Sequence, residues 1–494
     1  MNPSASALSA VDDTAVADYD LAVVGSGPAG MAAAIDAAER GLSVAVIDDQ
    51  PLPGGQIYRQ VGDPVLQDRN VLGPDYYYGE SLVQRFCAAT VDRIDRASVW
   101  EAGPRHLCLS RDGRSRRLGF KALLLATGAQ ERPVPFPGWT LPGVMTCGAA
   151  QIMLKTSGLA PSAPLVLAGS GPLLLLLACQ LLRTGIQVEA VLETTPTAHY
   201  RDALRELGGA LRGWRALAKG MGLLAELKRG GVKHLGGVSE LRALADSEGK
   251  LDRISYRRRG REQRIACRTL LVHQGVVPNV QLSRAVGAEH HWDALQECWR
   301  PTLDSWGASS IDNLFIAGDG SGIGGALVAE KQGRLAALAI AARLQRISDQ
   351  ERDAEAAPIQ REIHRELAIR PFLDRLYRPA QEFLRPADDT LVCRCEEVTA
   401  GEIRRIARGG CAGPNQAKAF SRAGMGPCQG RLCGLTVSQL IAEAREVPVA
   451  DVGYYRVRSP IKPITLGELA AMATPAKELG AHDAKPAPAA DAKH

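Results

Sequence analysis

The 494 residues suffice for two or three domains with cores of their own, and 46% hydrophobic beside 23% charged residues is typical of a soluble globular chain. The 59 basic and 54 acidic residues leave a net charge of only +5, without a basic stripe interleaved with aromatics, so no nucleic-acid partner is expected. Eleven cysteines, an odd number with four at tight spacings, favour metal ligation in a reducing compartment over a disulfide framework.

The first 17 residues carry acids where a signal peptide needs a basic and then an apolar region, which predicts a flexible lead-in and a cytoplasmic protein. Peripheral association with the inner face of the membrane is compatible with that location. The most apolar run, Leu173 to Leu182, is too short to span a bilayer. We therefore expect a buried helix there and no transmembrane segment. Residues 474–494, rich in Ala, Pro and Lys, predict a disordered tail.

From Leu21 to Asp48 the chain reads as an apolar strand, a glycine turn, an alanine-rich helix and a second strand ending in an acid. This is the pattern of a dinucleotide-binding fingerprint, whose glycines permit a tight turn, close approach of a pyrophosphate and close packing of helix on strand. The helix N-terminus adds free N–H groups and positive dipole for the phosphates. The residues expected at this nucleotide site are Gly25, Ser26, Gly27, Pro28, Ala29, Gly30, Asp48 and Asp49.

Further glycine turns follow along the first third of the chain. Gly54, Gly55 and Gln56 predict a turn that brings backbone close to a ring system. A helix is expected from about residue 80 to 95 and a short strand over 97–100. A pair of strands then leads to the second glycine turn, Ala126-Thr127-Gly128.

The first pattern returns over residues 165–174, where Gly169 and Gly171 align with Gly25 and Gly27. Leu174 replaces the third glycine, which moves the helix from its strand and narrows the room for a pyrophosphate. Two alternatives stay open: a second bound nucleotide, NAD or an adenine nucleotide, and a fold kept only as a structural domain. Short alternating strands between residues 231 and 277 complete this inserted domain, and His273 is expected to be a packed core residue.

Residues 313–325 predict a strand, Gly318-Asp319, and a glycine-rich entry into a helix over 326–344. An acid at such a strand end can place its carboxylate on a sugar hydroxyl while the next helix dipole faces a ring carbonyl.

Beyond a helical connector lie Cys393, Cys395, Cys428 and Cys433, which form a C-x-C, a 32-residue interval and a C-x4-C. Each short pair sits on a turn and the helical interval holds the turns together, so four thiolates can converge on one metal centre. The interleaved Arg394, Gln429 and Arg431 would resist burial, which disfavours four buried thiols. Zinc and iron–sulfur are both open from spacing alone, and Cys411 is expected to be structural.

Over about residues 18–345 the chain resembles the two-dinucleotide-domain flavoprotein disulfide reductase fold. The resemblance rests on four motifs in this order: the fingerprint that ends in Asp48, the turn Ala126-Thr127-Gly128, the repeat at Gly169 and Gly171, and Gly318-Asp319. The resemblance implies an α/β fold and FAD at the first fingerprint. It puts Asp48 on the adenosine ribose and Asp319 on the ribityl chain. Because Cys147 stands alone, without a second redox-active cysteine, a disulfide reductase mechanism is not expected. The further FAD contacts expected are Gly55, Gln56, Val99 near the adenine, Thr127, Gly128 and Gly318.

The cysteine segment resembles the [2Fe-2S] domain of bacterioferritin-associated ferredoxin. Its relatives usually end with C-x2-C, whereas this chain ends with C-x4-C. The neighbouring flavin domain favours [2Fe-2S] over zinc. With its C-terminal segment, the whole chain is similar to the α subunit of heteromeric amine or imino-acid dehydrogenases, such as opine oxidases, D-hydroxyproline dehydrogenase and hydrogen cyanide synthase. In that family an FAD-containing β subunit, similar to amino-acid oxidases, oxidises the C–N bond. Some relatives carry FMN at a subunit interface or a small third subunit, for which this sequence has no signature.

The expected organisation has seven parts. They are a lead-in (1–17), an FAD-binding domain (18–160 and 285–350), a second dinucleotide-binding-like domain (161–284), a helical connector (351–388), a [2Fe-2S] domain (389–447), a packing segment (448–473) and a tail (474–494). The expected function is transfer of electrons from the β subunit through FAD and [2Fe-2S] to an acceptor such as a quinone, with no catalytic residue of its own. Two alternatives are a self-contained NAD(P)H-dependent reductase, against which Leu174 argues, and a non-catalytic assembly subunit.

Overall fold

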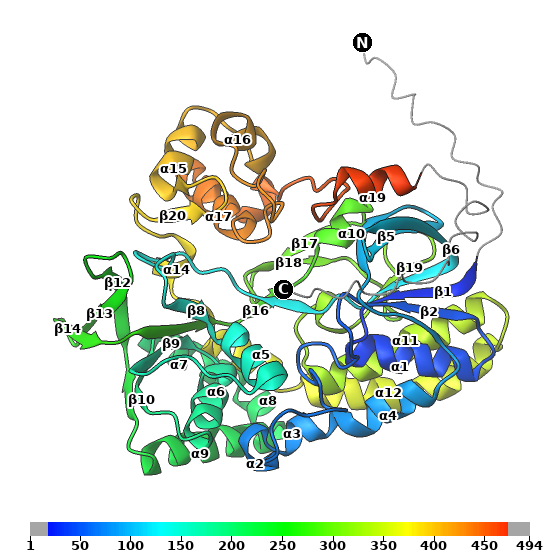
Figure 1. Ribbon diagram of the computed structural model, residues 1–494, viewed down its shortest axis with the longest axis horizontal. Helices are drawn as coiled ribbons and strands as arrows, with labels where there is room; N and C mark the ends of the chain where they lie inside the picture. Colours follow the sequence, from blue (N-terminus) through cyan, green and yellow to red (C-terminus); the bar gives the residue numbers. More distant parts are fainter. Residues whose placement is uncertain (1–17, 473–494) are drawn as a thin grey trace, which may run out of the picture.

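A computed structural model describes residues 18–472, so the expectations for the lead-in and the tail lie outside the described residues. Figure 1 shows two α/β units side by side and a small helical unit, coloured orange, that carries the four cysteines. Within residues 18–472, no helix combines the length and the apolar character needed to cross a membrane.

The first unit is built on a parallel sheet in which β3 (Asp92–Ile94), β2 (Val44–Ile47), β1 (Tyr19–Val24), β6 (Arg114–Leu125) and β19 (Leu314–Ile316) lie side by side. Strands β5 (His106–Arg111) and β4 (Ser98–Ala102) continue from β6 in antiparallel order. Helices α1 (Pro28–Glu39), α4 (Gly79–Ala88) and α11 (Ala326–Arg343) cover one face (Figure 1). The carboxyl ends of parallel strands meet at one sheet edge, so the turns after β1, β2, β6 and β19 gather there.

The helix expected over residues 80–95 is wrong at its C-terminal end. Helix α4 ends at Ala88, and Asp92 to Ile94 form β3, which pairs with Ala45 to Ile47 of β2. Strand β3 completes the sheet edge and buries Ile94. Tertiary pairing therefore overrides the local helical pattern.

The second unit repeats the first pattern as β9 (Leu165–Ser170), α6 (Pro172–Arg183) and β10 (Val188–Glu193). Its sheet has the order β11 (Lys233–Gly236), β10, β9, β15 (Thr269–Gln274) and β8 (Val144–Thr146). Strands β12 (Val238–Ala245), β13 (Leu251–Arg258) and β14 (Arg261–Ala266) form a separate antiparallel sheet. Between β10 and β11 lie α7 (Thr197–Ala203), η1 (Leu204–Glu206), α8 (Leu207–Arg212) and α9 (Trp214–Arg229).

Several short elements join the two units. Helices α2 (Arg69–Leu72) and α3 (Pro74–Tyr77) leave the first unit, and α2 reaches α6 of the second. Helix α5 (Cys147–Ser157) lies beside α6, and β7 (Ala129–Glu131) pairs with β16 (Val276–Pro278). The return path runs through α10 (Gln281–Ala285), β17 (His290–Asp293), β18 (Cys298–Pro301) and η2 (Gly318–Gly320).

The connector consists of α12 (Asp349–Leu367), α13 (Arg370–Leu376) and α14 (Gln381–Leu384). The four-cysteine module follows as β20 (Leu391–Cys393), β21 (Val398–Thr399), α15 (Ala400–Arg408), α16 (Pro414–Ser421) and α17 (Gly434–Arg445), and the chain continues through α18 (Val449–Val452) to α19 (Leu466–Ala471). Trp299 of β18 belongs to the same buried cluster as Leu440 and Tyr455. The module therefore shares a hydrophobic core with the first unit.

Candidate functional site

The first glycine turn is shaped by close backbone approaches that only glycine permits. Gly25 has φ +106°, and a Cβ there would lie 2.4 Å from the carbonyl oxygen of Ala126. A Cβ on Gly30 would lie 1.9 Å from the carbonyl oxygen of Gly25, so α1 packs directly on β1. The N-terminus of α1 is thereby held at the sheet edge, where its free N–H groups can meet phosphates.

Asp48, at the end of β2, is held in place by the glycine turn itself. Its Oδ2 accepts hydrogen bonds from the Ser26 amide at 2.6 Å and the Ser26 hydroxyl at 2.7 Å, and its Oδ1 accepts one from the Gln50 amide at 2.8 Å. The neighbouring Asp49 forms an ion pair with Lys462 of the C-terminal segment. Asp48 thus presents an ordered carboxylate beside the turn, as a ribose-binding acid requires.

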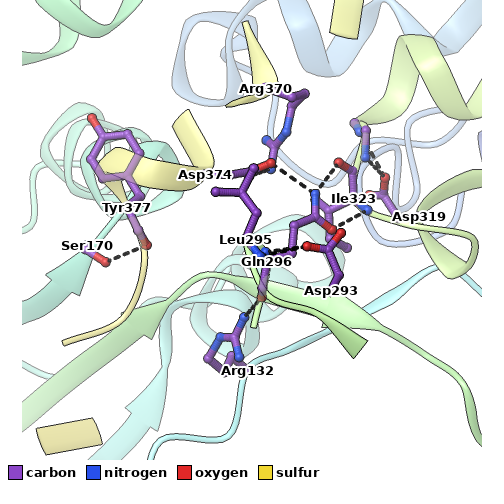
Figure 2. A network of polar contacts seen from close by, with 12 residues as sticks. Arg132, Ser170, Asp293, Leu295, Gln296, Asp319, Ile323, Arg370, Asp374 and Tyr377 are labelled. Atoms are coloured by element: carbon purple, nitrogen blue, oxygen red, sulfur yellow. Dashed lines mark hydrogen bonds and ion pairs between the residues drawn. The ribbon is translucent and has the colours of Figure 1, made fainter. Parts of the chain in front are cut away.

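Asp319 lies in η2 and belongs to a polar network that joins the first unit to the connector (Figure 2). Its Oδ1 accepts hydrogen bonds from the Gly324 and Gly325 amides, each at 2.9 Å. The hub of the network is Gln296, whose Nε2 donates to the Ile323 carbonyl and to Asp374 Oδ2, both at 3.2 Å. Sequence reasoning missed Gln296, because nothing in the local sequence distinguishes this glutamine from an exposed loop residue.

A cavity of about 1130 Å³ runs along the sheet edge and between the two units. Ten of the residues expected to contact FAD line it: Gly25, Gly27, Asp48, Asp49, Gly55, Gln56, Val99, Thr127, Gly128 and Asp319. The other five lie behind its wall, where Ser26 holds Asp48, Pro28, Ala29 and Gly30 form the first turn of α1, and Gly318 packs on Ala29. A Cβ on Gly55 would lie 2.8 Å from the Gly27 Cα, so the two glycine backbones pack directly on each other at the cavity wall. These features fit an FAD.

Lys155 of α5 contacts the turn that the sequence places beside a ring system. The Nζ atom donates to the carbonyl oxygens of Gln56 and Ile57 at 3.0 Å and to Gln151 Oε1 at 3.1 Å. Burial and the nearby Arg59 charge lower the pKa of Lys155 to about 7. This lysine, with no distinguishing spacing in the sequence, fixes the second unit to the cavity-lining turn of the first.

His273 is buried, as expected, and it is also hydrogen-bonded at the cavity wall. Its Nδ1 lies 2.6 Å from Glu131 Oε1, and Glu131 Oε2 accepts a hydrogen bond from the Gly148 amide at 2.6 Å. Glu131 and Gly148 line the cavity, so this buried contact fixes the N-terminus of α5 against β7.

The glycine turn of the second unit, from Gly169 to Gly171, is tied to neighbouring parts of the same chain. Ser170 Oγ donates to Gln274 Oε1 at 3.2 Å. It also lies 3.5 Å from the Tyr377 carbonyl oxygen, a contact that Figure 2 shows. Glu193, the acid that ends β10, accepts a hydrogen bond from the Tyr200 hydroxyl at 2.9 Å and lies 3.3 Å from His234 Nε2. Burial alone would raise the pKa of the Glu193 carboxyl, but these hydrogen bonds outweigh burial, so the net effect is a lowered pKa. Polar groups that a second nucleotide would use are therefore already engaged.

The four cysteines come together as two pairs. The Cys433 thiol contacts the Cys393 sulfur, and Cys428 contacts Cys395. Across the described part of the chain, no three of these four sulfurs lie within 4.8 Å of one another. The Cys433 thiol, with the amides of Gly424, Glu396 and Cys395, outweighs burial and lowers the pKa of Cys393 to about 6. Cys411 is buried apart from them, with its thiol 3.3 Å from the Gly413 carbonyl oxygen.

The loop between Cys428 and Cys433 forms part of the cavity wall. Arg431 lines the cavity, and its half-buried guanidinium donates to the Ile461 carbonyl at 2.6 Å. Gln130 and Gln281, which also line the cavity, donate to the carbonyls of Arg431 and Gln429, each at 3.0 Å. The nucleotide cavity and the cysteine site therefore share a wall.

Two family models match the chain. The model described as pyridine nucleotide-disulphide oxidoreductase matches residues 19–333, and the sarcosine oxidase A3 domain matches residues 387–473. An opine oxidase subunit of Agrobacterium tumefaciens (strain Ach5) is 44% identical over 94% of this chain and 93% of that protein. Hydrogen cyanide synthase subunit HcnB of Pseudomonas aeruginosa is 37% identical over 90% of this chain and 96% of that protein.

Among solved structures, L-proline dehydrogenase from P. horikoshii is similar to the chain with a TM-score of 0.65 at 18% sequence identity. The similarity covers 91% of this chain and 79% of that one. At this identity it supports the fold alone, an arrangement of Rossmann-like α/β units.

Proposed function

The chain belongs to the family of these opine oxidase subunits, within the pyridine nucleotide-disulphide oxidoreductases, and from this membership we propose that it is the electron-transferring α subunit of a heteromeric amino-acid dehydrogenase. A partner β subunit with its own FAD oxidises the C–N bond of an opine, D-hydroxyproline or similar amine. The α subunit receives the electrons and passes them through FAD and a [2Fe-2S] cluster to an acceptor such as a quinone. We expect these steps in the cytoplasm.

In this proposal the chain's residues hold and orient the flavin. The N-terminus of α1 would meet the pyrophosphate, and Asp48 would accept hydrogen bonds from the ribose hydroxyls. Val99 would lie near the adenine, and Asp319 would lie near the ribityl chain. Gly55, Gln56, Thr127 and Gly128 form the walls between them. The flavin supplies two-electron chemistry, and the protein supplies binding, orientation and exclusion of water.

The pairing of the cysteines supports a [2Fe-2S] cluster over a single zinc ion. A Zn–S distance of about 2.3 Å puts all four sulfurs of a tetrahedral site about 3.8 Å apart. A two-iron cluster instead takes two thiolates on each iron, which keeps the pairs apart. The cysteines fit the two-iron cluster, because Cys393 contacts Cys433 and Cys395 contacts Cys428. Among the described residues, no three of these four sulfurs lie close to one another. Backbone amides at the Cys393 sulfur suit the two-iron cluster as well.

The single observation that carries the proposed function is the wall shared by the two sites. Arg431 lies between Cys428 and Cys433 and lines the cavity that Asp48 and Asp319 also line. Cofactors held at both places would be neighbours, which is the requirement of an electron path.

The experiment that tests the proposal is iron and acid-labile sulfide analysis of the anaerobically purified chain, with flavin analysis and an EPR spectrum after dithionite reduction. We expect FAD, two irons, two sulfides and a reduced [2Fe-2S] signal, with no amino-acid oxidation by the chain alone. Cys411→Ser is the matched control and should retain the cluster. Zinc without sulfide, or amino-acid oxidation without a partner, would overturn the proposal.

A further inference from the structure

The cavity extends past the expected FAD contacts into a space bounded by α2, α3, α5, α6 and α9. These helices are neighbours at the junction of the two α/β units (Figure 1). We call this space the side chamber and define it by its apolar lining residues, Leu72, Tyr76, Ile152, Leu173, Leu176 and Leu223. It is part of the same cavity that Gln56 lines, so a ligand in it would lie next to the flavin of the proposed function.

The polar groups around the side chamber are bonded to one another. The Arg183 guanidinium donates to both carboxylate oxygens of Glu226 at 2.7 Å, and Lys219 forms an ion pair with Asp75 at the rim. Gln151 Nε2 donates to Gln180 Oε1 at 2.9 Å. A ligand rich in charge, such as a nucleotide phosphate, would have to break these pairs, whereas a planar apolar ring gains burial without doing so.

The outer surface of α9 indicates where such a ligand would come from. Leu211, Trp214 and Met221 are each more than half exposed, on and just before this helix. Residues 197–229 contain seven Arg and Lys against three Asp and Glu. Exposed apolar side chains among basic residues are typical of a helix that adsorbs to an anionic lipid surface. Leu223 of the same helix lines the side chamber, so the chamber and the apolar, basic surface share one helix.

We propose that the side chamber binds an acceptor of the quinone class, supplied from a lipid surface on which the outer face of α9 lies. The inference rests on the proposed function, because it names the acceptor in that electron path, and it assigns the FAD rather than the cluster as the cofactor that reduces the quinone. Oxidation of a C–N bond releases two electrons and two protons. A quinone takes up two electrons and two protons to become a hydroquinone, so the exchange is balanced without a further reactant.

The test uses the full chain with FAD in place and a short-chain azidoquinone as the probe. Photo-crosslinking followed by peptide mapping is expected to label residues 147–183 and 214–229. Leu176→Trp fills the chamber and is expected to weaken binding of decylubiquinone by at least about tenfold. The matched control, Leu159→Trp, adds the same side chain at an exposed site outside the cavity lining and should bind as the wild type does.

Labels confined to the four-cysteine module, or wild-type binding by Leu176→Trp, would overturn the assignment. If Leu176→Trp does not retain FAD, Ile152→Phe replaces it as the blocking variant. Trp214→Glu is expected to slow quinone uptake from phosphatidylglycerol vesicles but not from water, and unchanged uptake from vesicles would overturn the lipid source. FAD content and the cluster EPR signal are measured on every variant. A variant that keeps both cofactors tests the quinone site alone, whereas a wild-type chain without FAD or cluster would overturn the proposed function.

Discussion

Asp48 accepts two hydrogen bonds from Ser26, one from the backbone amide at 2.6 Å and one from the hydroxyl at 2.7 Å. The residue expected to bind the ribose is thus positioned by the same glycine turn that receives the phosphates. Fingerprint and acid form one rigid unit, although 22 positions separate Ser26 and Asp48.

Asp48→Ala should weaken FAD binding. A charge-assisted hydrogen bond contributes about 1.5–3 kcal/mol, so its loss predicts roughly ten- to a hundredfold weaker binding. Equilibrium dialysis of FAD against the flavin-free chain measures the effect. Asp95→Ala, which removes a carboxylate that pairs with Arg93 at the surface, is the control and should leave FAD binding unchanged. Equal FAD affinity in both variants would show that FAD does not use Asp48.

Gly30→Ala should destabilise the first unit. The new Cβ would lie 1.9 Å from the Gly25 carbonyl oxygen, so α1 must move from β1. Overpacking of this kind costs about 1–3 kcal/mol, and the free energy of unfolding in urea should fall by that amount. The matched control is Gly220→Ala, within α9, where a Cβ meets nothing within 4 Å. That variant should gain about 0.5–1 kcal/mol from helix propensity. Equal effects at the two positions would contradict the packing argument.

The pairing of the four cysteines predicts which disulfides form once the cluster is removed. Mild oxidation of the cluster-free chain with diamide should join Cys393 to Cys433 and Cys395 to Cys428, because these sulfurs are in contact. Peptide mapping by mass spectrometry measures the pairing. Cys411 should stay reduced and serves as the internal control, since its thiol faces the Gly413 carbonyl. A dominant Cys393 to Cys395 or Cys428 to Cys433 disulfide would contradict the two-pair arrangement.

The burial of Lys155 predicts a pH dependence of stability. Its pKa is about 7 in the folded chain against 10.5 for an ordinary lysine, so between these values the unfolded state binds more protons than the folded state. The free energy of unfolding should therefore rise with pH from about 7 to 10.5, by at most about 1.4 kcal/mol per pH unit from this group. Below pH 7 both states are protonated and the slope vanishes.

Urea unfolding of Lys155→Met across this pH range isolates the contribution of Lys155. The variant should lack the part of the slope that the wild type owes to the lysine, while Lys228→Met, at an exposed position in the last turn of α9, should keep it. If the free energy of unfolding depends on pH equally in all three proteins, the pH dependence arises from groups other than Lys155.

The elements that the sequence predicts correctly depend on short-range patterns. The strand, glycine turn, helix and strand from β1 to β2 are all present, because the turn glycines and the apolar strands act on neighbours in the chain. The end of α4 at Ala88 was not predictable, because β3 exists through its pairing with β2. A segment of three residues gains little by itself and becomes a strand only beside an existing sheet edge.

Residue types at fixed spacings were enough to predict the nucleotide turn with Asp48, the repeated fold and the four cysteines. Folding in three dimensions was needed to pair Cys393 with Cys433, to anchor the network beside Asp319 on Gln296, and to bring Lys155 and Arg431 to the cavity. These residues act on groups tens to hundreds of positions away. Such contacts exist only after the sheets have formed and the buried polar atoms have found partners, a selection that depends on packing across the whole molecule.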